Sequence, residues 1–288
     1  MTAAAIHAAL VQPFENLAFM RAALVACLAL ALSNGVVGTL LVLRRMSLDG
    51  DVLGHAVMPG AAVGFLYGGP SPAWLSLGGL VSGLAVAILS GIVVSERTRR
   101  EAGLVVFYLL ALALGVLLIA WRGSNVDVMR VLFGTVLAID RSALLQIAAA
   151  SSIVVIAVAA LYRPLAVGAF DPAFLRAIGH RAPYAMLFLG LVVLTLVASF
   201  QAFGTLFALG PLLLPAAAAR CWGLGAAGSM ALASAFGALA SVAGLLGSYH
   251  FDLPSGPAIV LVAGLLFGMS VAATGALRRL TPLFVREA

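Results

Sequence analysis

Asp51 and His55 stand four residues apart in an otherwise apolar stretch, "RRMSLDGDVLGHAVMPGAAVGF" at 44–65. Ser47 is a suitable N-cap for a helix here, and residues i and i+4 of a helix share one face. In a helix beginning at Leu48 the two side chains would lie about 6 and 12 Å along the axis. A carboxylate and an imidazole are ligands that suit Zn²⁺, Mn²⁺ or Fe²⁺. The spacing therefore makes the pair a candidate metal site.

The chain that carries this pair is strongly apolar. Of its 288 residues 64% are hydrophobic and 9% charged, and the mean hydropathy is +1.17. A soluble domain of this length cannot bury so much apolar surface, which predicts an all-α, polytopic helical bundle in a lipid bilayer. All sixteen basic residues are arginine, so a Walker A lysine and a Schiff-base lysine are excluded. The arginines are scattered between apolar runs, which indicates membrane anchoring and no nucleic-acid partner.

Two interpretations of Asp51 and His55 follow from the residues. Two ligands are too few for a closed structural site, so an ion site would need water or symmetry-related residues to complete it. If the protein is a symmetric dimer about a central pore, two copies supply four ligands. In the alternative, Asp51 stabilises the helix N-terminus and His55 hydrogen-bonds to it or to a neighbour. Ionisable side chains inside a membrane are costly and tend to face cavities, which favours the ion site without excluding the alternative.

Apolar runs of roughly spanning length predict the helices that position these residues. They cover 17–43, 50–67, 73–95, 103–121, 142–162, 184–201, 203–219, 225–247 and 256–277. The second and seventh are short or contain proline, so the prediction is eight to nine spans. Residues 1–16 are expected to be a short extracytoplasmic segment, 17–277 the transmembrane domain and 278–288 a cytoplasmic tail.

The arginines predict the orientation. Twelve of the sixteen fall in alternate loops on one side, which the positive-inside rule makes cytoplasmic. The N-terminus is then outside and the C-terminus inside, which favours nine spans over eight unless one segment is re-entrant.

The loop "RPLAVGAFDPAFLRAIGHRAPYA" at 163–185 has the signals of a short amphipathic helix. Asp171 can cap it, Pro172 suits its first turn and Gly179 can end it. Its apolar side would consist of Phe174, Leu175 and Ile178. Such a helix either lies at the membrane surface or docks its apolar side in a groove of a partner protein.

Several prolines and one histidine are further candidates for the pathway. Pro59 and Gly60 are predicted to interrupt the helix after His55, and such a break is tolerated where it lines a cavity. Pro211 and Pro215 predict a kinked span or a half-helix. His250 is placed in an outer loop, where a rigid turn is the first interpretation and metal ligation the second.

Four blocks of the sequence resemble, in order, the integral-membrane permeases of the metal-ion ABC importers, the ABC-3 type that handles zinc, manganese or iron. "GTLLVLRRMSLDGDVLGHAVMPGAAVGF" resembles the second-helix motif of that family, and "AFDPAFLRAIG" resembles its cytoplasmic coupling helix. "GTLFALGPLLLPAAAAR" and "YHFDLPSGPAIVLVAGLLF" resemble its late helices. The resemblance runs from about residue 20 to 277.

This resemblance implies that Asp51 and His55 hold the transported ion in the pore, at the axis of a homodimer. It implies a coupling helix at about 170–180 that docks on a separate cytoplasmic ATPase, through Phe170, Asp171, Pro172, Phe174, Leu175, Arg176 and Gly179. It also implies an extracytoplasmic metal-binding protein and a place in the bacterial inner membrane. The chain itself would be no enzyme and would hold no permanent cofactor, since Zn, Mn or Fe is its cargo.

The sequence departs from the family pattern at two places. Gly54 stands where the family usually has serine, and "RREAGLVVFYLLALALG" lacks the acidic-then-small pattern expected at the start of the fourth span. Two other transport functions stay open. A stand-alone secondary metal-ion transporter would need more buried acidic residues than Asp51, and an ABC permease for a metal chelate such as a siderophore or haem would need a wider, aromatic-lined pore. A membrane-embedded hydrolase has little support, because no serine stands at a glycine elbow.

Overall fold

The computed structural model describes residues 7, 11–69, 71–93, 106, 109–110, 113–114, 117, 136–170 and 183–280. Across these residues the regular secondary structure is helical, with no strand, which confirms the all-α class. The elements are α2 (Gln12–Asn16), α3 (Ala18–Leu43), α4 (Ser47–Gly68), α5 (Pro72–Val93), the 3-10 turn η1 (Val136–Ala138), α8 (Arg141–Ala160), α9 (Tyr162–Phe170), α11 (Pro183–Phe207), α12 (Leu209–Cys221), α13 (Ala226–Phe251) and α14 (Ser255–Leu280).

The predicted apolar runs fall on these helices, except that 103–121 lies mostly outside the described residues. Within the described part, α3, α5, α8, α11, α13 and α14 are long and apolar enough to cross a membrane. Helix α4 is not among them, because Asp51 and His55 lower its hydropathy. Helix α12 has 13 residues, or about 20 Å, against the roughly 30 Å of a bilayer core. The chain is therefore a multi-pass membrane protein.

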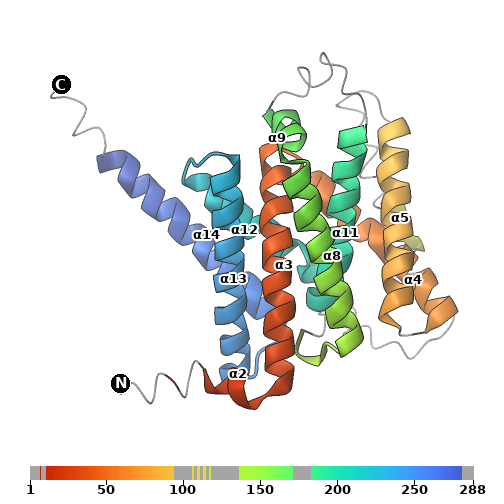
Figure 1. The fold of residues 1–288 in the computed structure, drawn as a ribbon, viewed down its shortest axis with the longest axis horizontal. Coiled ribbons are helices and arrows are strands. Elements are labelled where there is room, and N and C mark those ends of the chain that lie inside the picture. The colour runs from red at the N-terminus through yellow and green to blue at the C-terminus, as the bar shows by residue number, and fades with distance from the viewer. Residues whose placement is uncertain are drawn as a thin grey trace.

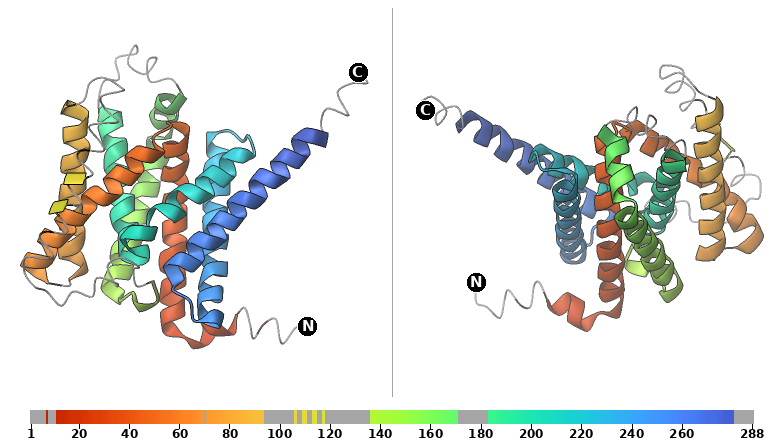
Figure 2. Two further views of the ribbon diagram at one scale, coloured as in Figure 1. Left: turned by 180° about the vertical axis from the view of Figure 1, so that it is seen from behind. Right: turned by 45° about the horizontal axis from the view of Figure 1, so that its top comes forward.

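Helices α3 and α11 form the centre of the bundle. In each, 67% of the apolar stretch is buried, against 17 to 22% in α5, α8 and α14. Figure 1 shows α13, α3, α8, α11 and α5 side by side, with α14 leading away from the bundle toward the C-terminus. Seen from behind in Figure 2, α4, α12 and α14 run obliquely across the upright helices. The outer helices therefore turn much of their apolar surface outward.

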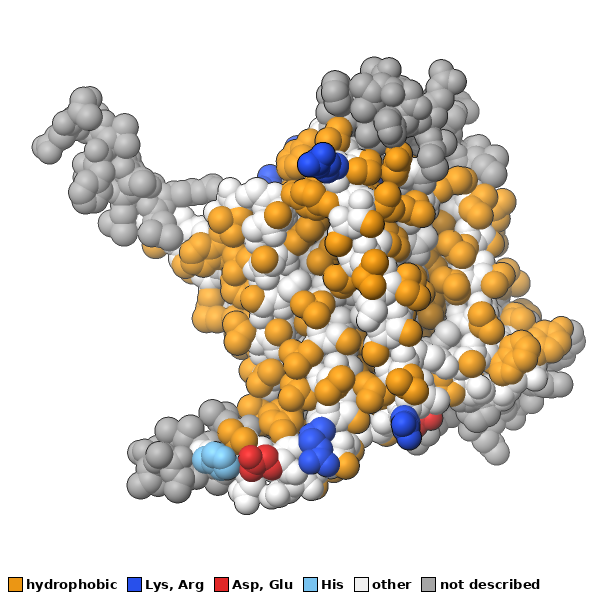
Figure 3. All heavy atoms as spheres, in the orientation of Figure 1, with side chains coloured by type: hydrophobic (Ala, Val, Ile, Leu, Met, Phe, Trp, Pro, Cys, Tyr) orange, Lys and Arg blue, Asp and Glu red, His pale blue; other side chains and the backbone are white. Residues whose placement is uncertain are grey.

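The outer surface is that of a protein in lipid. Figure 3 shows hydrophobic side chains over the length of the bundle and charged side chains gathered at its two ends. Large apolar side chains such as Leu145, Ile156 and Leu261 are more than 60% exposed. A soluble protein would not expose apolar area on this scale, but a bilayer accepts it.

Buried hydroxyl and amide groups join the central helices. Ser33 Oγ in α3 donates to Ser151 Oγ in α8 at 3.2 Å, and Ser199 Oγ in α11 donates to Asn34 Oδ1 in α3 at 3.0 Å. All four side chains are buried. In lipid such bonds supply part of the attraction between helices that the hydrophobic effect supplies in water.

Candidate metal-ion site on helix α4

A tight turn joins α3 to α4 and sets where the site begins. The Met46 N–H donates to the carbonyl of Leu41 at 3.0 Å, and the Arg45 N–H donates to the carbonyl of Val42 at 3.1 Å. This is the bond pattern of a Schellman turn. Arg45 takes the left-handed position of that turn, with φ of 56°, which glycine usually occupies. The predicted cap at Ser47 is wrong: α4 begins at Ser47 itself, after Met46, which makes no side-chain capping bond.

Asp51 and His55 share one face of α4. His55 Nε2 lies 3.6 Å from Asp51 Oδ1, and the two side chains are 20% and 52% exposed respectively. Two metal–ligand bonds of about 2.1 Å that meet at a tetrahedral angle separate their donor atoms by roughly 3.4 Å. The pair is therefore spaced to share one ion, and it is also close enough to form an ion pair when the imidazole is protonated.

Glycines on other faces of α4 let its neighbours approach. A Cβ at Gly60 would collide with the carbonyl oxygen of Gly78 in α5, and one at Gly64 would collide with that of Trp74. A Cβ at Gly54 would meet Leu209 Cδ1 at 3.6 Å, an ordinary contact. At about 100° per residue, Gly60 lies opposite Asp51 on the helix. Packing on α5 thus turns the Asp51 face outward.

The predicted interruption at Pro59 is wrong, because α4 continues as one helix from Ser47 to Gly68 with Pro59 inside it. Proline lacks an N–H and disturbs the backbone bonds of the preceding turn. Ser82 Oγ of α5 donates to the carbonyl of Ala56 at 2.8 Å, within that turn. A neighbouring hydroxyl that satisfies such carbonyls lets a helix pass through proline in a membrane.

The exposed side of α4 forms a row at four-residue spacing. It starts with Asp51 and His55 and continues to Val63, which is 38% exposed, and Tyr67, which is 82% exposed. The row begins with two ionisable groups and ends with apolar or aromatic ones.

A break in the late helices is present near the end of α11, before the two prolines from which a kink was predicted. Gly204 has φ of 76° and ψ of 176°, which interrupts the helix, and α12 restarts at Leu209. Pro211 and Pro215 lie within α12 and are buried. The restart packs on α4, since Leu209 is the side chain that faces Gly54. Helix α12 thus agrees with the half-helix alternative, and its place beside α4 was not predicted.

His250 does not lie in an outer loop. It belongs to the last turn of α13, which ends at Phe251, and its ring lies edge-on to Tyr249 with 5.3 Å between ring centroids. Figure 1 places the end of α13 near α2, at the opposite end of the bundle from the turn between α3 and α4. His250 therefore lies far from the α4 pair.

Of the predicted coupling residues, Phe170 is the last residue of α9 and is 64% exposed. The others, Asp171, Pro172, Phe174, Leu175, Arg176 and Gly179, lie outside the described residues.

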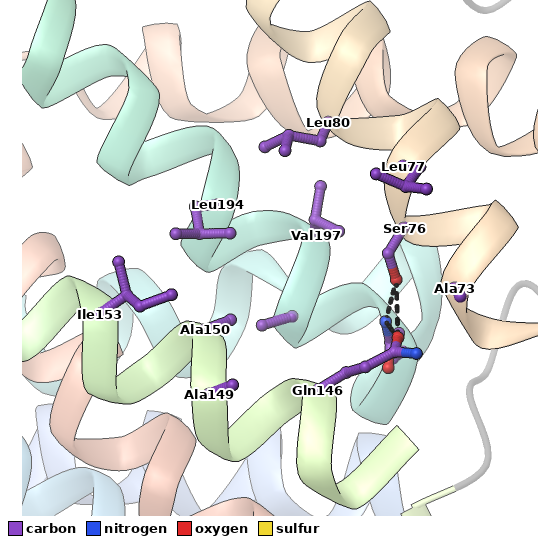
Figure 4. Close-up of a pocket in the computed structure, with 12 residues that line it drawn as sticks. Ala73, Ser76, Leu77, Leu80, Gln146, Ala149, Ala150, Ile153, Leu194 and Val197 are labelled. Carbon is purple, nitrogen blue, oxygen red and sulfur yellow. Dashed lines mark hydrogen bonds between the residues drawn. The ribbon is translucent and has the colours of Figure 1, made fainter. Parts of the chain in front are cut away.

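A cleft between α5, α8 and α11 is a second candidate site, which the sequence analysis missed. It has a volume of about 340 Å³, and Figure 4 shows its apolar walls with Ser76 and Gln146 at one end. Gln201 Nε2 donates to Ser76 Oγ, and the side-chain amide of Gln146 lies 3.2 Å from both Ser76 Oγ and Gln201 Nε2. Glutamines at 146 and 201 inside apolar runs were the available signal. The side chains that line this cleft include no acid or histidine, so the cluster joins helices and offers no strong metal ligand.

Over the described ranges, no group of three or more His, Cys, Asp or Glu side chains is close enough to hold a metal ion. In this part of a single chain the candidate site therefore has two possible ligands, Asp51 and His55.

The sequence resembles known transport proteins along most of its length. Residues 16–274 match the sequence model of the ABC 3 transport family. The chain is 34% identical over 251 residues to the manganese transport system membrane protein MntC of Listeria monocytogenes, covering 86% of this chain and 88% of that protein. It is 33% identical over 254 residues to the manganese import system permease protein ScaB of Streptococcus parasanguinis, covering 88% and 89%.

Solved structures share the fold. A chain of PsaBC from Streptococcus pneumoniae in complex with Fab is similar with a TM-score of 0.82 at 30% identity, covering 91% of this chain and 94% of that chain. A metal-chelate type ABC transporter in an inward-facing conformation has the same fold, with a TM-score of 0.66 at 18% identity and coverage of 91% and 88%. Because the family match spans residues 16–274 and relatives above 30% identity cover over four-fifths of the chain, the protein belongs to the ABC 3 transport family and is a membrane permease of the ABC transporter class.

Proposed function

We propose that this permease imports a divalent transition-metal ion, with manganese as the first candidate, past a pore site formed by Asp51 and His55. The observation that carries the proposal is the spacing of the pair, 3.6 Å between Nε2 and Oδ1, on an outward face of α4. A site of two ligands binds an ion without enclosing it, which suits an ion that must leave again. The names of the relatives MntC and ScaB favour manganese over zinc and iron.

A second copy of the chain would complete the site. The exposed row on α4 offers a surface for a symmetric contact, and a two-fold axis beside Asp51 would bring two carboxylates and two imidazoles together. Four such ligands are a suitable set for Mn²⁺, Fe²⁺ or Zn²⁺.

The remaining parts of the importer follow from the family. We infer a separate ATPase that docks on a coupling helix at about 170–180, and an extracytoplasmic protein that delivers the ion. The arginine distribution supports a nine-span arrangement in the bacterial inner membrane, with the N-terminus outside. The chain has no lysine, so the ATP-binding lysine must belong to another subunit.

The first prediction tests the pair. Asp51→Ala and His55→Ala should each lower metal uptake by about a hundredfold or more, because loss of a residue that only supports a metal ligand already costs about 10- to 100-fold, while membrane insertion persists. Uptake of radiolabelled manganese into cells provides the measurement. Asp49→Asn is the control, because it removes the same charge two residues away, about 200° around α4 from Asp51. Normal uptake in both alanine variants would overturn the site.

Competition among ions and dependence on ATP separate the alternatives. Excess unlabelled manganese should displace the label better than zinc, iron or an iron–siderophore complex. Loss of uptake in cells that lack the ATPase subunit is the expected result. Uptake that continues there, driven by an ion gradient, would instead indicate a stand-alone secondary transporter, and preference for the complex would indicate a chelate permease.

A further inference from the structure

Arg44 contacts both helices that flank the 171–182 segment. Arg44 follows α3 directly. Its Nη2 donates to the carbonyl oxygen of Leu165 at 3.2 Å, and its guanidinium carbon lies 4.1 Å from the ring centroid of Phe188. Leu165 belongs to α9, five residues before that helix ends, and Phe188 lies in the second turn of α11. The Arg44 side chain thus contacts both α9 and α11, which we call the stems of this segment.

The surroundings of Arg44 make these contacts firm. Leu165 and Phe188 are both 0% exposed. Burial lowers the pKa of Arg44 to about 10, so the guanidinium stays charged at neutral pH. A cation over an aromatic ring attracts more strongly when both are withdrawn from water. A shift of α9 or α11 relative to Arg44 must therefore carry Arg44 along or break these contacts.

Arg44 is also part of the turn that positions the candidate metal site. The next residue, Arg45, holds the left-handed conformation of the Schellman turn, and Met46 packs in the same apolar core as Leu165 and Phe188. Helix α4 follows at once, with Asp51 about 6 Å along its axis. Because only this short, hydrogen-bonded turn separates Arg44 from α4, a movement of the Arg44 guanidinium should also displace the Asp51 carboxylate.

We propose that Arg44 is a positioning residue. It transmits movement of the stems α9 and α11 to the Asp51–His55 pair through the α3–α4 turn. The inference rests on the proposed function, in which the 171–182 segment between these two helices docks on the ATPase. Arg44 itself touches no transported ion. It sets how far α4 turns when the stems move, which is how a nucleotide-driven displacement reaches the pore.

The test uses the whole importer, with its ATPase and delivery protein, reconstituted in liposomes. Manganese uptake and ATP hydrolysis are measured for the wild type, Arg44→Met and Arg44→Lys. The control is Arg163→Met, which removes an exposed arginine of α9 two residues from Leu165. In Arg44→Met, ions carried per ATP should fall about tenfold or more, the usual range of coupling between two sites. The KM for manganese should stay within about twofold.

The other variants give the contrast. Arg44→Lys should recover part of the ratio, because an ammonium can still lie over Phe188. Arg163→Met should keep the wild-type ratio. A wild-type ratio in Arg44→Met would overturn the proposal, and so would a loss of uptake and hydrolysis in equal proportion, which indicates damage to the fold. A wild-type importer that takes up no manganese would overturn the proposed function, and this proposal with it.

Discussion

The carboxylate of Asp140 fixes where α8 begins. Asp140 Oδ1 accepts a hydrogen bond from the Ala143 N–H at 2.8 Å, and Oδ2 accepts one from Ser142 Oγ at 2.7 Å. The bond from the Ala143 backbone, and then that from Ser142, lower the pKa of Asp140 below its usual 3.8. Both bonds favour the ionised carboxylate.

This cap has a predictable pH dependence. The pKa of Asp140 is lower in the folded protein than in the unfolded chain. The stability that its carboxylate adds to the fold is therefore complete above the usual pKa, and it is lost as the pH falls through the lowered value. Asp140→Ala should cost about 1 kcal/mol at pH 7, seen as a lower melting temperature in detergent. The difference from wild type should shrink below about pH 4. Asp140→Asn, which caps without a charge, should stay near wild type at pH 7. Equal melting temperatures for all three at pH 7 would contradict the prediction.

The mutual placement of Asp51 and His55 could be predicted from sequence because their geometry is local. A spacing of four residues puts Asp51 and His55 on one side of any helix, and the 3.6 Å separation agrees. What lies around the pair could not be predicted. Gly54 faces Leu209, which follows it by 155 positions in the chain, and no local pattern encodes that contact.

At the scale of helices, α4 and α5 pack through glycine. The fourth prediction compares Gly60→Ala with Gly54→Ala on the same helix. Gly60→Ala drives a methyl group into the backbone of Gly78 and should cost about 1 to 3 kcal/mol, as overpacking does. Gly54→Ala meets only an ordinary contact and replaces glycine in a helix, so it should be neutral or stabilising by up to about 1 kcal/mol. Melting in detergent measures both, and equal loss in the two variants would refute the packing argument.

The same comparison shows that packing does not require the glycine at Gly54, one of the two departures from the family pattern. There is room for a small side chain at Gly54, so the serine usual in the family would fit the space without displacing Leu209.

Apolar length predicted the helices well, because lipid forces a span to satisfy its own backbone hydrogen bonds. The prediction failed at Pro59, where a hydroxyl from Ser82, on the next helix, supports the disturbed turn. The break before α12 is at Gly204, whose backbone conformation favours glycine, and not at Pro211 or Pro215, from which a kink was predicted. Proline weakens a helix, and the contacts from the neighbouring helix determine whether the weakened helix is interrupted.

At the scale of the whole molecule, the proposed dimer makes a fifth prediction. In a chain whose Cys27 and Cys221 are changed to alanine, Val63→Cys should cross-link two copies in the membrane, because Val63 lies in the exposed row of α4. A short bis-maleimide and gel electrophoresis provide the measurement. Leu145→Cys is the control: Leu145 is 61% exposed against 38% for Val63, but on α8. Cross-linking of both to the same extent would argue against a contact through α4.

The bonds of Asn34 and Ser33 have a consequence for how the protein is made. Their partners lie 165 and 118 residues later in the chain. At a synthesis rate of about 5 to 20 residues per second, Ser199 follows Asn34 out of the ribosome by roughly 10 to 30 s. During that interval α3 is already of spanning length, yet its amide lacks the bond that it makes in the finished bundle. Helix α3, which lies at the centre of the finished bundle, is thus synthesised before the other long helices that the structure describes. The insertion machinery must shelter its polar side until α8 and α11 are made.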